Sequence, residues 1–226
     1  MHAAVITFPG SNREGDVARA LRLGGARVSH AWHADYDLPK GTDLVVLPGG
    51  FSYGDYLRCG AIAGRAHIME AVRKHAAGGG LVLGICNGFQ ILCESGLLPG
   101  ILTRNAGLKF ICKMQHLKVG RTDTPFTRLY RRDQVIEVCI AHGEGNYTAD
   151  AETLARLEGE DRVAFRYCDA SGNTSEAANI NGSLNHIAGI YSDKRNVLGM
   201  MPHPENLIET LTGGTDGLAL FKGLAA

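Results

Sequence analysis

The sequence predicts an α/β protein built on a doubly wound, mostly parallel β-sheet with helices on both faces. In the first half of the chain, short apolar runs without alternation are separated by helical patterns. Strands buried on both faces form such runs, and a helix between successive strands makes them parallel. A chain of 226 residues can bury one sizeable core, so we expect a single domain over 1–226.

The first half is expected to form four strands and three helices. The strands are 3–8, 27–32, 43–48 and 81–86, and the helices are 15–23, 61–76 and 88–95. Within 61–76, apolar residues recur at steps of three and four, which predicts one continuous helix with a single buried face. The residues of this face are Ile62, Ala66, Met69, Val72 and Ala76.

The second half has a different character. Residues 101–147 contain apolar runs with little helical periodicity, so we expect a small antiparallel addition to the parallel core. A helix near 150–158 and a strand over 163–169 follow. The segments 187–192 and 196–203 flank a polar turn and predict a hairpin, and a helix over 217–225 closes the chain.

Composition limits the classes of partner. The 23 lysines and arginines balance the 23 aspartates and glutamates, so we expect neither a nucleic-acid surface nor binding to an anionic membrane. No apolar stretch is long enough to span a bilayer, and the first residues do not resemble a signal peptide. The six cysteines have no paired spacing, which favours a reducing cytoplasm.

The segment 84–88, Gly-Ile-Cys-Asn-Gly, joins an expected strand to an expected helix. This G-x-C-x-G pattern is the cysteine counterpart of the elbow that lifts a nucleophile above a sheet. A helix N-terminus favours the thiolate, so Cys86 is placed to attack a carbonyl carbon. The alternative is a small buried thiol, which is our interpretation of the other five cysteines. Packing alone does not call for glycine on both sides, which favours the nucleophile.

Two further segments supply what a nucleophilic cysteine needs. His203 and Glu205 are two residues apart at the end of an expected strand, where extended chain would put their side chains on one face. His203 would then act as the general base and Glu205 would orient it, although an incidental surface pair or metal ligands are alternatives. Gly49 and Gly50 also follow a strand. They either present N–H donors to an oxyanion or form a plain turn.

With these three segments in order, the chain resembles the class I glutamine amidotransferases, which carry a Cys-His-Glu triad on a flavodoxin-like core. Within that class it resembles the glutaminase subunits of phosphoribosylformylglycinamidine synthase, over almost the whole chain. The segments that single out this branch are FSYGDYLRCGAIA (51–63) and AHGEGNY (141–147). The segments LVLGICNGFQIL (81–92) and GMMPHPE (199–205) indicate only the class and not the branch.

The resemblance implies a role for each matching residue. Cys86 would be the nucleophile, His203 the acid and base, and Glu205 the residue that orients it. Backbone N–H groups near Gly50 and of Asn87 would form the oxyanion hole, and Gln90 would help to hold glutamine. The implied substrate-binding residues are therefore Gly50, Phe51, Asn87 and Gln90, and no metal ligand is implied.

Some residues have less definite roles. The backbone over 105–110 is expected to aid substrate binding. His142 and Glu144 fit a place beside the pocket, a partner surface or a structural hydrogen-bonding role. Arg13 stands where the family often has cysteine, and Asn206 where a basic residue commonly follows the P-H-P-E motif. We expect neither to touch the three catalytic residues, but both to affect partner contacts.

The resemblance also implies partners. Glutamine would be the substrate, and the released ammonia would pass to a large synthetase subunit that binds ATP and magnesium and makes formylglycinamidine ribonucleotide for purine biosynthesis. A small third subunit commonly bridges the two. The chain has no G-x-x-x-x-G-K-[ST] loop, so we expect no cofactor in it.

Three alternatives to a glutaminase stay open. The first is another cysteine hydrolase on the same core, which the P-H-P-E motif disfavours. The second is a metal hydrolase with His142, Glu144, His203 and Glu205 as ligands, although no metal motif accompanies them. The third is a non-catalytic regulatory or scaffold subunit that kept the fold and lost the chemistry.

Overall fold

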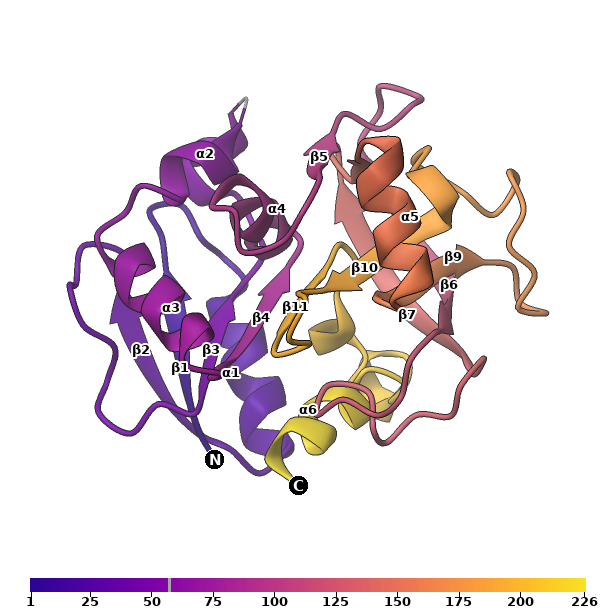
Figure 1. Cartoon of the computed structure of the whole chain (residues 1–226). Coiled ribbons are helices and arrows are strands. Elements are labelled where there is room, and N and C mark those ends of the chain that lie inside the picture. The colour runs from indigo at the N-terminus through magenta and orange to yellow at the C-terminus, as the bar shows by residue number, and fades with distance from the viewer. Residues whose placement is uncertain (57) are drawn as a thin grey trace.

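A computed structural model describes residues 1–56 and 58–226, and its main feature is one large sheet flanked by helices (Figure 1). Leu57, which belongs to the segment 51–63 quoted above, lies outside the described residues. Within them, the sheet has nine strands in the order β2-β1-β3-β4-β11-β10-β9-β6-β7. The predicted α/β class with helices on both faces is confirmed.

Five neighbouring strands form the parallel half of this sheet. They are β2 (Arg27–Trp32), β1 (His2–Thr7), β3 (Leu44–Leu47), β4 (Leu81–Ile85) and β11 (Val197–Met200). Leu47 pairs with Gly84, and Ile85 pairs with Met200, so the carboxyl ends of β3, β4 and β11 lie level. Residues of β3 are fully buried, as the continuous apolar pattern predicts for a strand covered on both faces.

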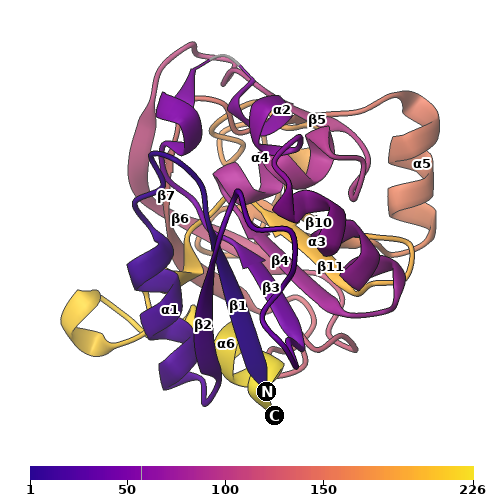
Figure 2. The ribbon, with the colours of Figure 1, turned by 90° about the vertical axis from the view of Figure 1, so that its left-hand side faces the viewer.

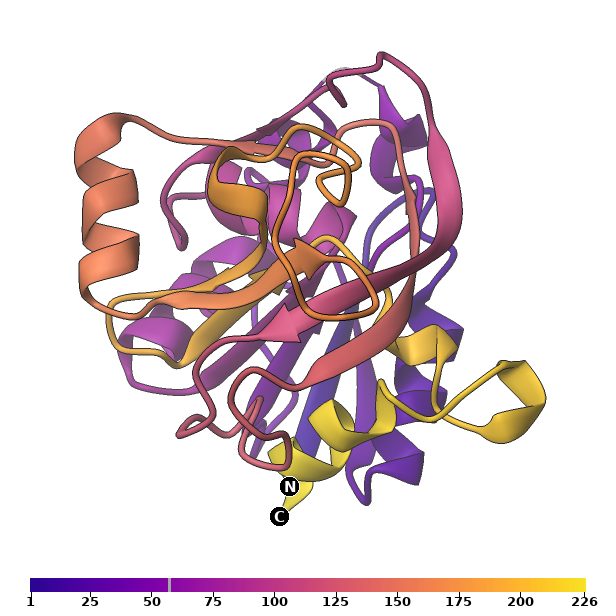
Figure 3. The same ribbon diagram turned by 90° about the vertical axis from the view of Figure 1, so that its right-hand side faces the viewer.

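The other four strands are antiparallel (Figure 3). They are β10 (Ile187–Tyr191), β9 (Val163–Cys168), β6 (Ile111–Val119) and β7 (Val135–His142). The predicted hairpin of β10 and β11 is confirmed. The antiparallel part is as extensive as the parallel part, whereas the sequence predicted a small addition. Buried and half-buried residues alternate along β7, and this pattern fits a strand with one covered face.

A second, two-stranded sheet and several short turns complete the strand-rich half. Strands β5 (Ile101–Thr103) and β8 (Asn146–Thr148) pair antiparallel. The 3-10 turns are η1 (Ser52–Asp55), η2 (Leu184–His186), η3 (Pro204–Asn206) and η4 (Thr210–Thr212).

Helices cover both faces of the parallel half (Figure 2). Helix α1 lies on one side of strands β1 to β3, and α3 lies on the other. The helices are α1 (Glu14–Leu23), α2 (Cys59–Ala63), α3 (Ile68–Ala77), α4 (Asn87–Glu94), α5 (Ala151–Gly159) and α6 (Leu218–Ala225). None of the helices among residues 1–56 and 58–226 combines the length and the hydropathy that a membrane span requires.

The expected helix over 61–76 is wrong as a continuous element. The chain forms α2 and α3 instead, and they are separated at residues 64–67. Helix α2 packs closely on α4, where a Cβ on Gly60 would lie 2.9 Å from the backbone of Gln90. The guanidinium of Arg73 donates to the freed carbonyl of Gly64 at 2.7 Å and stabilises the break. Ile62 therefore leaves the buried face and is 49% exposed.

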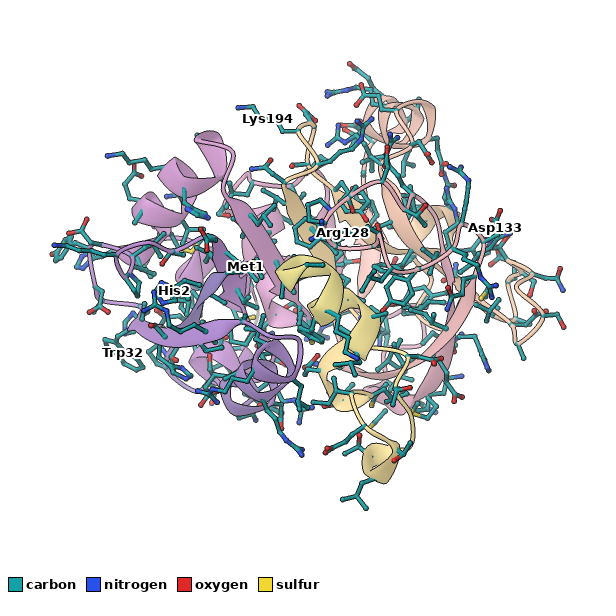
Figure 4. All side chains as sticks on the ribbon, turned by 90° about the horizontal axis from the view of Figure 1, so that it is seen from below. Met1, His2, Trp32, Arg128, Asp133 and Lys194 are labelled. Atoms are coloured by element: carbon teal, nitrogen blue, oxygen red, sulfur yellow. The ribbon has the colours of Figure 1, made fainter. Side chains whose placement is uncertain are left out.

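Both chain ends lie at the same end of the molecule (Figure 1), and Figure 4 views this end from below. Helix α6 covers the sheet there beside α1. The Arg128 side chain lies against it, with Nε donating to the carbonyl of Gly223 at 2.7 Å and Nη2 to that of Ala226 at 2.5 Å. These bonds satisfy carbonyl groups that the last helical turn leaves without partners.

Helix α4 approaches the sheet so closely that only glycine fits at its second residue. A Cβ added to Gly88 would lie 1.9 Å from the carbonyl oxygen of Leu47 on β3. We predict that Gly88→Ala lowers the unfolding free energy by about 3 kcal/mol, because the backbone of α4 or β3 must shift. Denaturant unfolding measures this.

Gly15→Ala is the matched control, because an added Cβ on this α1 residue meets nothing within 4 Å. It should be neutral or stabilise the protein by up to about 1 kcal/mol, since alanine favours helix. Equal stability of Gly88→Ala and the natural protein would contradict the packing argument.

Candidate active site

Four loops at one edge of the sheet carry the residues that the sequence singles out. They follow neighbouring parallel strands: Arg13 comes after β1, Gly50 after β3, Cys86 after β4 and His203 after β11. In open α/β sheets, ligands bind outside the carboxyl ends of the strands, next to the point where the strand order reverses. The chain reverses here between β1 and β3, so the loops converge at the expected place.

Cys86 forms the turn between β4 and α4 in an unusual backbone conformation. Its φ is 51° and its ψ is −107°, a region that residues with a side chain rarely adopt. The N–H of Cys86 donates to the carbonyl of Met200 at 2.8 Å, which fixes the turn beside β11. The side chain is 6% exposed, and Sγ lies 3.8 Å from the carbonyl oxygen of Ala141.

The two glycines around Cys86 serve close packing. Neither has a positive φ; instead, a Cβ on Gly84 would lie 2.7 Å from the backbone of Gly88. The prediction that packing alone does not call for both glycines is therefore wrong. Packing requires them, because α4 begins directly against β3 and β4. Gly84 and Gly88 also help to form the turn, because the close approach that they permit places the N-terminus of α4 at Cys86.

His203 and Glu205 form a buried pair. His203 Nδ1 lies 2.7 Å from Glu205 Oε1, and the residues are 3% and 2% exposed. The expected extended chain is wrong here, because residues 204–206 form η3 with Pro204 at its start. The turn brings the two side chains together. The N–H of His203 donates to the carbonyl of Cys139 at 2.8 Å, which joins it to β7.

Cys86 and His203 lie side by side over Gly49. A Cβ on Gly49 would lie 2.8 Å from His203 Cε1 and 3.1 Å from Cys86 Cβ, so only glycine fits there. Burial opposes a charge on His203, but the Glu205 carboxylate and the Cys86 sulfur outweigh it and hold the pKa of His203 well above its usual value. Its Nε2 is buried, with no hydrogen bond among the described residues. It is available for proton transfer.

The loop after β3 is held in place by the side chain of Asn87. Asn87 Oδ1 accepts from the N–H of Ser52 at 2.9 Å, and its Nδ2 donates to Asp55 Oδ1 at 3.0 Å. Gly50 and Phe51 have φ values of 88° and 43°, which turn this loop towards Cys86. In the described part of the chain, the backbone N–H groups of Gly50 and Asn87 donate to no protein acceptor. They fit the expected oxyanion hole.

Gln90 lies one turn into α4, and the protein holds its amide from both sides. Its Oε1 accepts from Asn87 Nδ2 at 2.7 Å, and its Nε2 donates to the carbonyl of Glu144 at 2.9 Å. The side chain lines the cavity, but these bonds also connect α4 to the segment after β7. Gln90 therefore shapes the pocket as well as facing it.

A cavity of about 210 Å³ opens over Cys86. Its lining includes all four residues expected to bind substrate, Gly50, Phe51, Asn87 and Gln90, together with Cys86 and His203. Glu205 lies behind His203, outside the lining. The antiparallel half supplies the opposite wall through Cys112, Cys139, Ala141, His142, Gly143 and Glu144. Sequence reasoning named only His142 and Glu144 from this wall.

His142 and Glu144 occupy different environments on that wall. His142 is 3% exposed, and its Nε2 accepts from Asn181 Nδ2 at 3.1 Å. Burial, followed by the charge of His203, lowers the pKa of His142 to about 3, so it is neutral near pH 7. Glu144 is half-buried, and burial with the nearby Asp55 carboxylate raises its pKa.

Two expectations about the surroundings are wrong. Arg13 does touch the candidate triad, because its Nε lies 3.8 Å from Glu205 Oε1, and its Nη2 donates to Asn206 Oδ1. Residues 105–110 do not line the cavity. Instead, Asn105 is fully buried and donates to the carbonyls of Lys109 and His142, so it braces the loops behind the wall. Sequence spacing gave no signal for the Arg13 contact.

Metal binding finds no support in this arrangement. Among the described residues, no group of three or more histidine, cysteine, aspartate and glutamate side chains is arranged to hold a metal ion. His203 Nδ1 is engaged by Glu205, and His142 Nε2 by Asn181. The two histidines of the suggested metal set therefore already have protein partners.

Comparison with known proteins agrees with this fold. The family model of the CobB/CobQ-like glutamine amidotransferase domain matches residues 1–214. The chain is 68% identical over 226 residues to phosphoribosylformylglycinamidine synthase subunit PurQ of Bradyrhizobium diazoefficiens, covering 100% of this chain and 97% of that protein. PurQ of Rhodospirillum rubrum is 58% identical over 225 residues, with coverage of 99% and 98%.

A solved structure extends the agreement to three dimensions. A chain in the structure of PurLQS from Thermotoga maritima matches with a TM-score of 0.87 and 41% identity, covering 99% of this chain and 97% of that one. The fold and the family model thus define a glutamine amidotransferase domain. Within that class, the chain belongs to the family of phosphoribosylformylglycinamidine synthase subunits PurQ.

The lowered pKa of His142 predicts a pH-dependent stability. Between pH 6.5 and about 3, the unfolded chain binds a proton at this residue and the folded chain does not. The unfolding free energy therefore falls by about 1.4 kcal/mol for each pH unit below 6.5. Between pH 7 and pH 4.5, we expect the unfolding free energy of His142→Gln to fall by about 3 kcal/mol less than that of the natural protein.

Denaturant unfolding at the two pH values measures this difference. The exposed His30 provides a matched control, and His30→Gln should follow the natural protein. Parallel losses of stability in His142→Gln and the natural protein would show that His142 titrates as it does in the unfolded chain.

Proposed function

We propose that this chain is the glutaminase subunit of phosphoribosylformylglycinamidine synthase, and that Cys86, His203 and Glu205 are its catalytic triad. The observation that carries the proposal is the arrangement around Gly49: the side chains of Cys86 and His203 lie side by side there, and Nδ1 of the imidazole binds the buried carboxylate of Glu205. This is the arrangement of nucleophile, base and orienting group that acyl transfer requires.

The reaction would proceed through a thioester. The Cys86 thiolate adds to the side-chain amide carbon of glutamine, and N–H groups near Gly50 and of Asn87 receive the oxyanion. The His203 imidazolium protonates the departing ammonia, which leaves the glutamyl thioester. Neutral His203 then takes a proton from water, and the resulting attack releases glutamate and restores the thiol. Glu205 stabilises the imidazolium in each half of the cycle.

The cavity suits a small zwitterionic substrate. Asp55 and Glu144 both line it and lie near enough for the Asp55 charge to raise the pKa of Glu144. Two neighbouring carboxylates favour a cation between them, and the α-ammonium group of glutamine carries that charge. We therefore place the α-amino end of the substrate near Asp55 and Glu144, with its amide at Cys86.

The released ammonia needs a partner to use it. We propose a large synthetase subunit, which binds ATP and magnesium, and a small bridging subunit; the name PurLQS of the similar structure joins Q to L and S. Large exposed apolar side chains support docking of a protein there: Phe51 lines the cavity and is 52% exposed, and Phe110, next to Gly143 of the cavity wall, is 58% exposed. No cofactor is assigned to this chain.

Two broader features complete the proposal. We infer that residues 1–226 act as one domain, because the sheet takes strands from both halves and the cavity has walls from both. We also infer that the protein works in the cytoplasm, where a reducing environment keeps the Cys86 thiol free.

Cys86→Ser provides the first test, in the complex assembled with the two partner subunits, ATP and formylglycinamide ribonucleotide. We expect glutamine-dependent synthesis to be lost and ammonia-dependent synthesis to be unchanged, because only the nucleophile is altered. Glutamate release and product formation are measured with each nitrogen source. Full glutamine-dependent turnover by this variant would refute the thioester mechanism and favour a scaffold role.

Glu205→Gln tests the orienting group. It keeps the shape of the side chain but removes the charge that raises the pKa of His203. We expect kcat for glutamine to fall about tenfold or more, with ammonia-dependent synthesis retained. An unchanged kcat would remove Glu205 from the triad.

A further inference from the structure

Glu205 is a carboxylate in an environment that stabilises it on one side only. Its side chain is fully buried, and Oε1 accepts the hydrogen bond from His203. Its second oxygen, Oε2, has no hydrogen bond within residues 1–56 and 58–226. A buried carboxylate is costly unless charge or hydrogen bonds compensate for it. A second group is therefore needed to compensate for the buried carboxylate and to keep it aimed at His203.

Arg13 is the cation in position to do this. Its Nε lies 3.8 Å from Glu205 Oε1, the oxygen that binds His203, and its side chain is 29% exposed. It is the residue before α1, and its stem crosses to the loop after β3, where a Cβ on Gly50 would lie 2.8 Å from Arg13 Cγ. Arg13 thus contacts both the carboxylate of the triad and the loop of the oxyanion hole.

Two neighbours hold the guanidinium in this place. Asp16 on α1 pairs with Nη1 at 3.1 Å, and Asn206 accepts from Nη2. Asn206 directly follows Glu205 in η3, so the turn that carries the carboxylate also carries the acceptor that fixes the cation. Arg13 lines the cavity over Cys86 together with Asp55, Glu144 and His203, and it lines a neighbouring cavity together with Asp16, Arg19 and Glu205.

We propose that Arg13 is a positioning residue for the triad, which holds the Glu205 carboxylate in the orientation that binds His203, with Asn206 as its anchor. It acts through Glu205. This inference rests on the proposed glutaminase function, and it assigns to the Arg13–Asn206 pair a role in the rate of the chemical steps.

Arg13→Gln in the assembled complex tests the proposal. We expect kcat for glutamine to fall about tenfold while KM changes less than about threefold, because orientation of the base is lost and substrate contacts remain. Removing a positive charge also favours the protonated form of every nearby group. The profile of kcat/KM against pH should therefore move to higher pH, which a merely structural role would not cause.

Two variants make the expectation specific. Arg13→Lys keeps the charge and should retain most of kcat and the natural pH profile. The double variant Arg13→Asn with Asn206→Arg places the cation at position 206, within the same cluster. It should recover part of the kcat for glutamine that Arg13→Gln loses. Arg19→Gln is the matched control: it removes an arginine of α1 that pairs with Glu209 at 2.6 Å, and it should behave as the natural protein.

The outcomes separate this inference from the proposed function. If Cys86→Ser keeps glutamine-dependent turnover, the proposed function fails. If Cys86→Ser loses that turnover but Arg13→Gln keeps the natural kcat and pH profile, only the role of Arg13 fails. A raised KM with unchanged kcat would make Arg13 a substrate contact and would also overturn the proposal. Thermal unfolding and ammonia-dependent synthesis show that each variant is folded and assembled.

Discussion

The backbone conformation of Cys86 is the constraint on which the rest of the site depends. A residue with a side chain at φ 51° and ψ −107° is strained, at a cost on the order of 1–3 kcal/mol, and it persists only where its surroundings fix it. Here the hydrogen bond to Met200 fixes the turn from β11, and Gly88 lets α4 begin against β3. The same contacts place the nucleophile, the helix N-terminus and the base at one edge of the sheet.

Electrostatics then determine what the packed residues can do. His203 is buried, which by itself favours the neutral imidazole, yet the adjacent Glu205 carboxylate and the Cys86 sulfur reverse that preference. His142, on the opposite wall of the same cavity, has no carboxylate partner among the residues that the structure describes, and its pKa falls to about 3. Two buried histidines therefore differ in charge because one carboxylate lies beside one of them.

The antiparallel half of the sheet matters for function because it closes the cavity. Strand β7 is last in the sheet order, yet Cys139 on β7 accepts the N–H of His203, so this half curves back to the end of β11. Ala141, Gly143 and Glu144 then form the wall opposite Cys86. A parallel sheet alone would leave the nucleophile open to water, whereas this extension forms an enclosed pocket beside it.

The sequence by itself determined the strands of the first half, the hairpin of β10 and β11, the turn at Cys86 and the group of Cys86, His203 and Glu205. These features depend on local patterns and short motifs. The tertiary structure alone decided the break between α2 and α3, the extent of the antiparallel half, the packing role of Gly84 and the contact of Arg13 with Glu205. Arg13 and Asn206 are separated by 193 residues in the chain, and only the parallel pairing of β1, β3, β4 and β11 in one sheet brings them to the same edge. Local periodicity carries no information about such a contact, because it is fixed by which strands pair and how closely the helices pack on them.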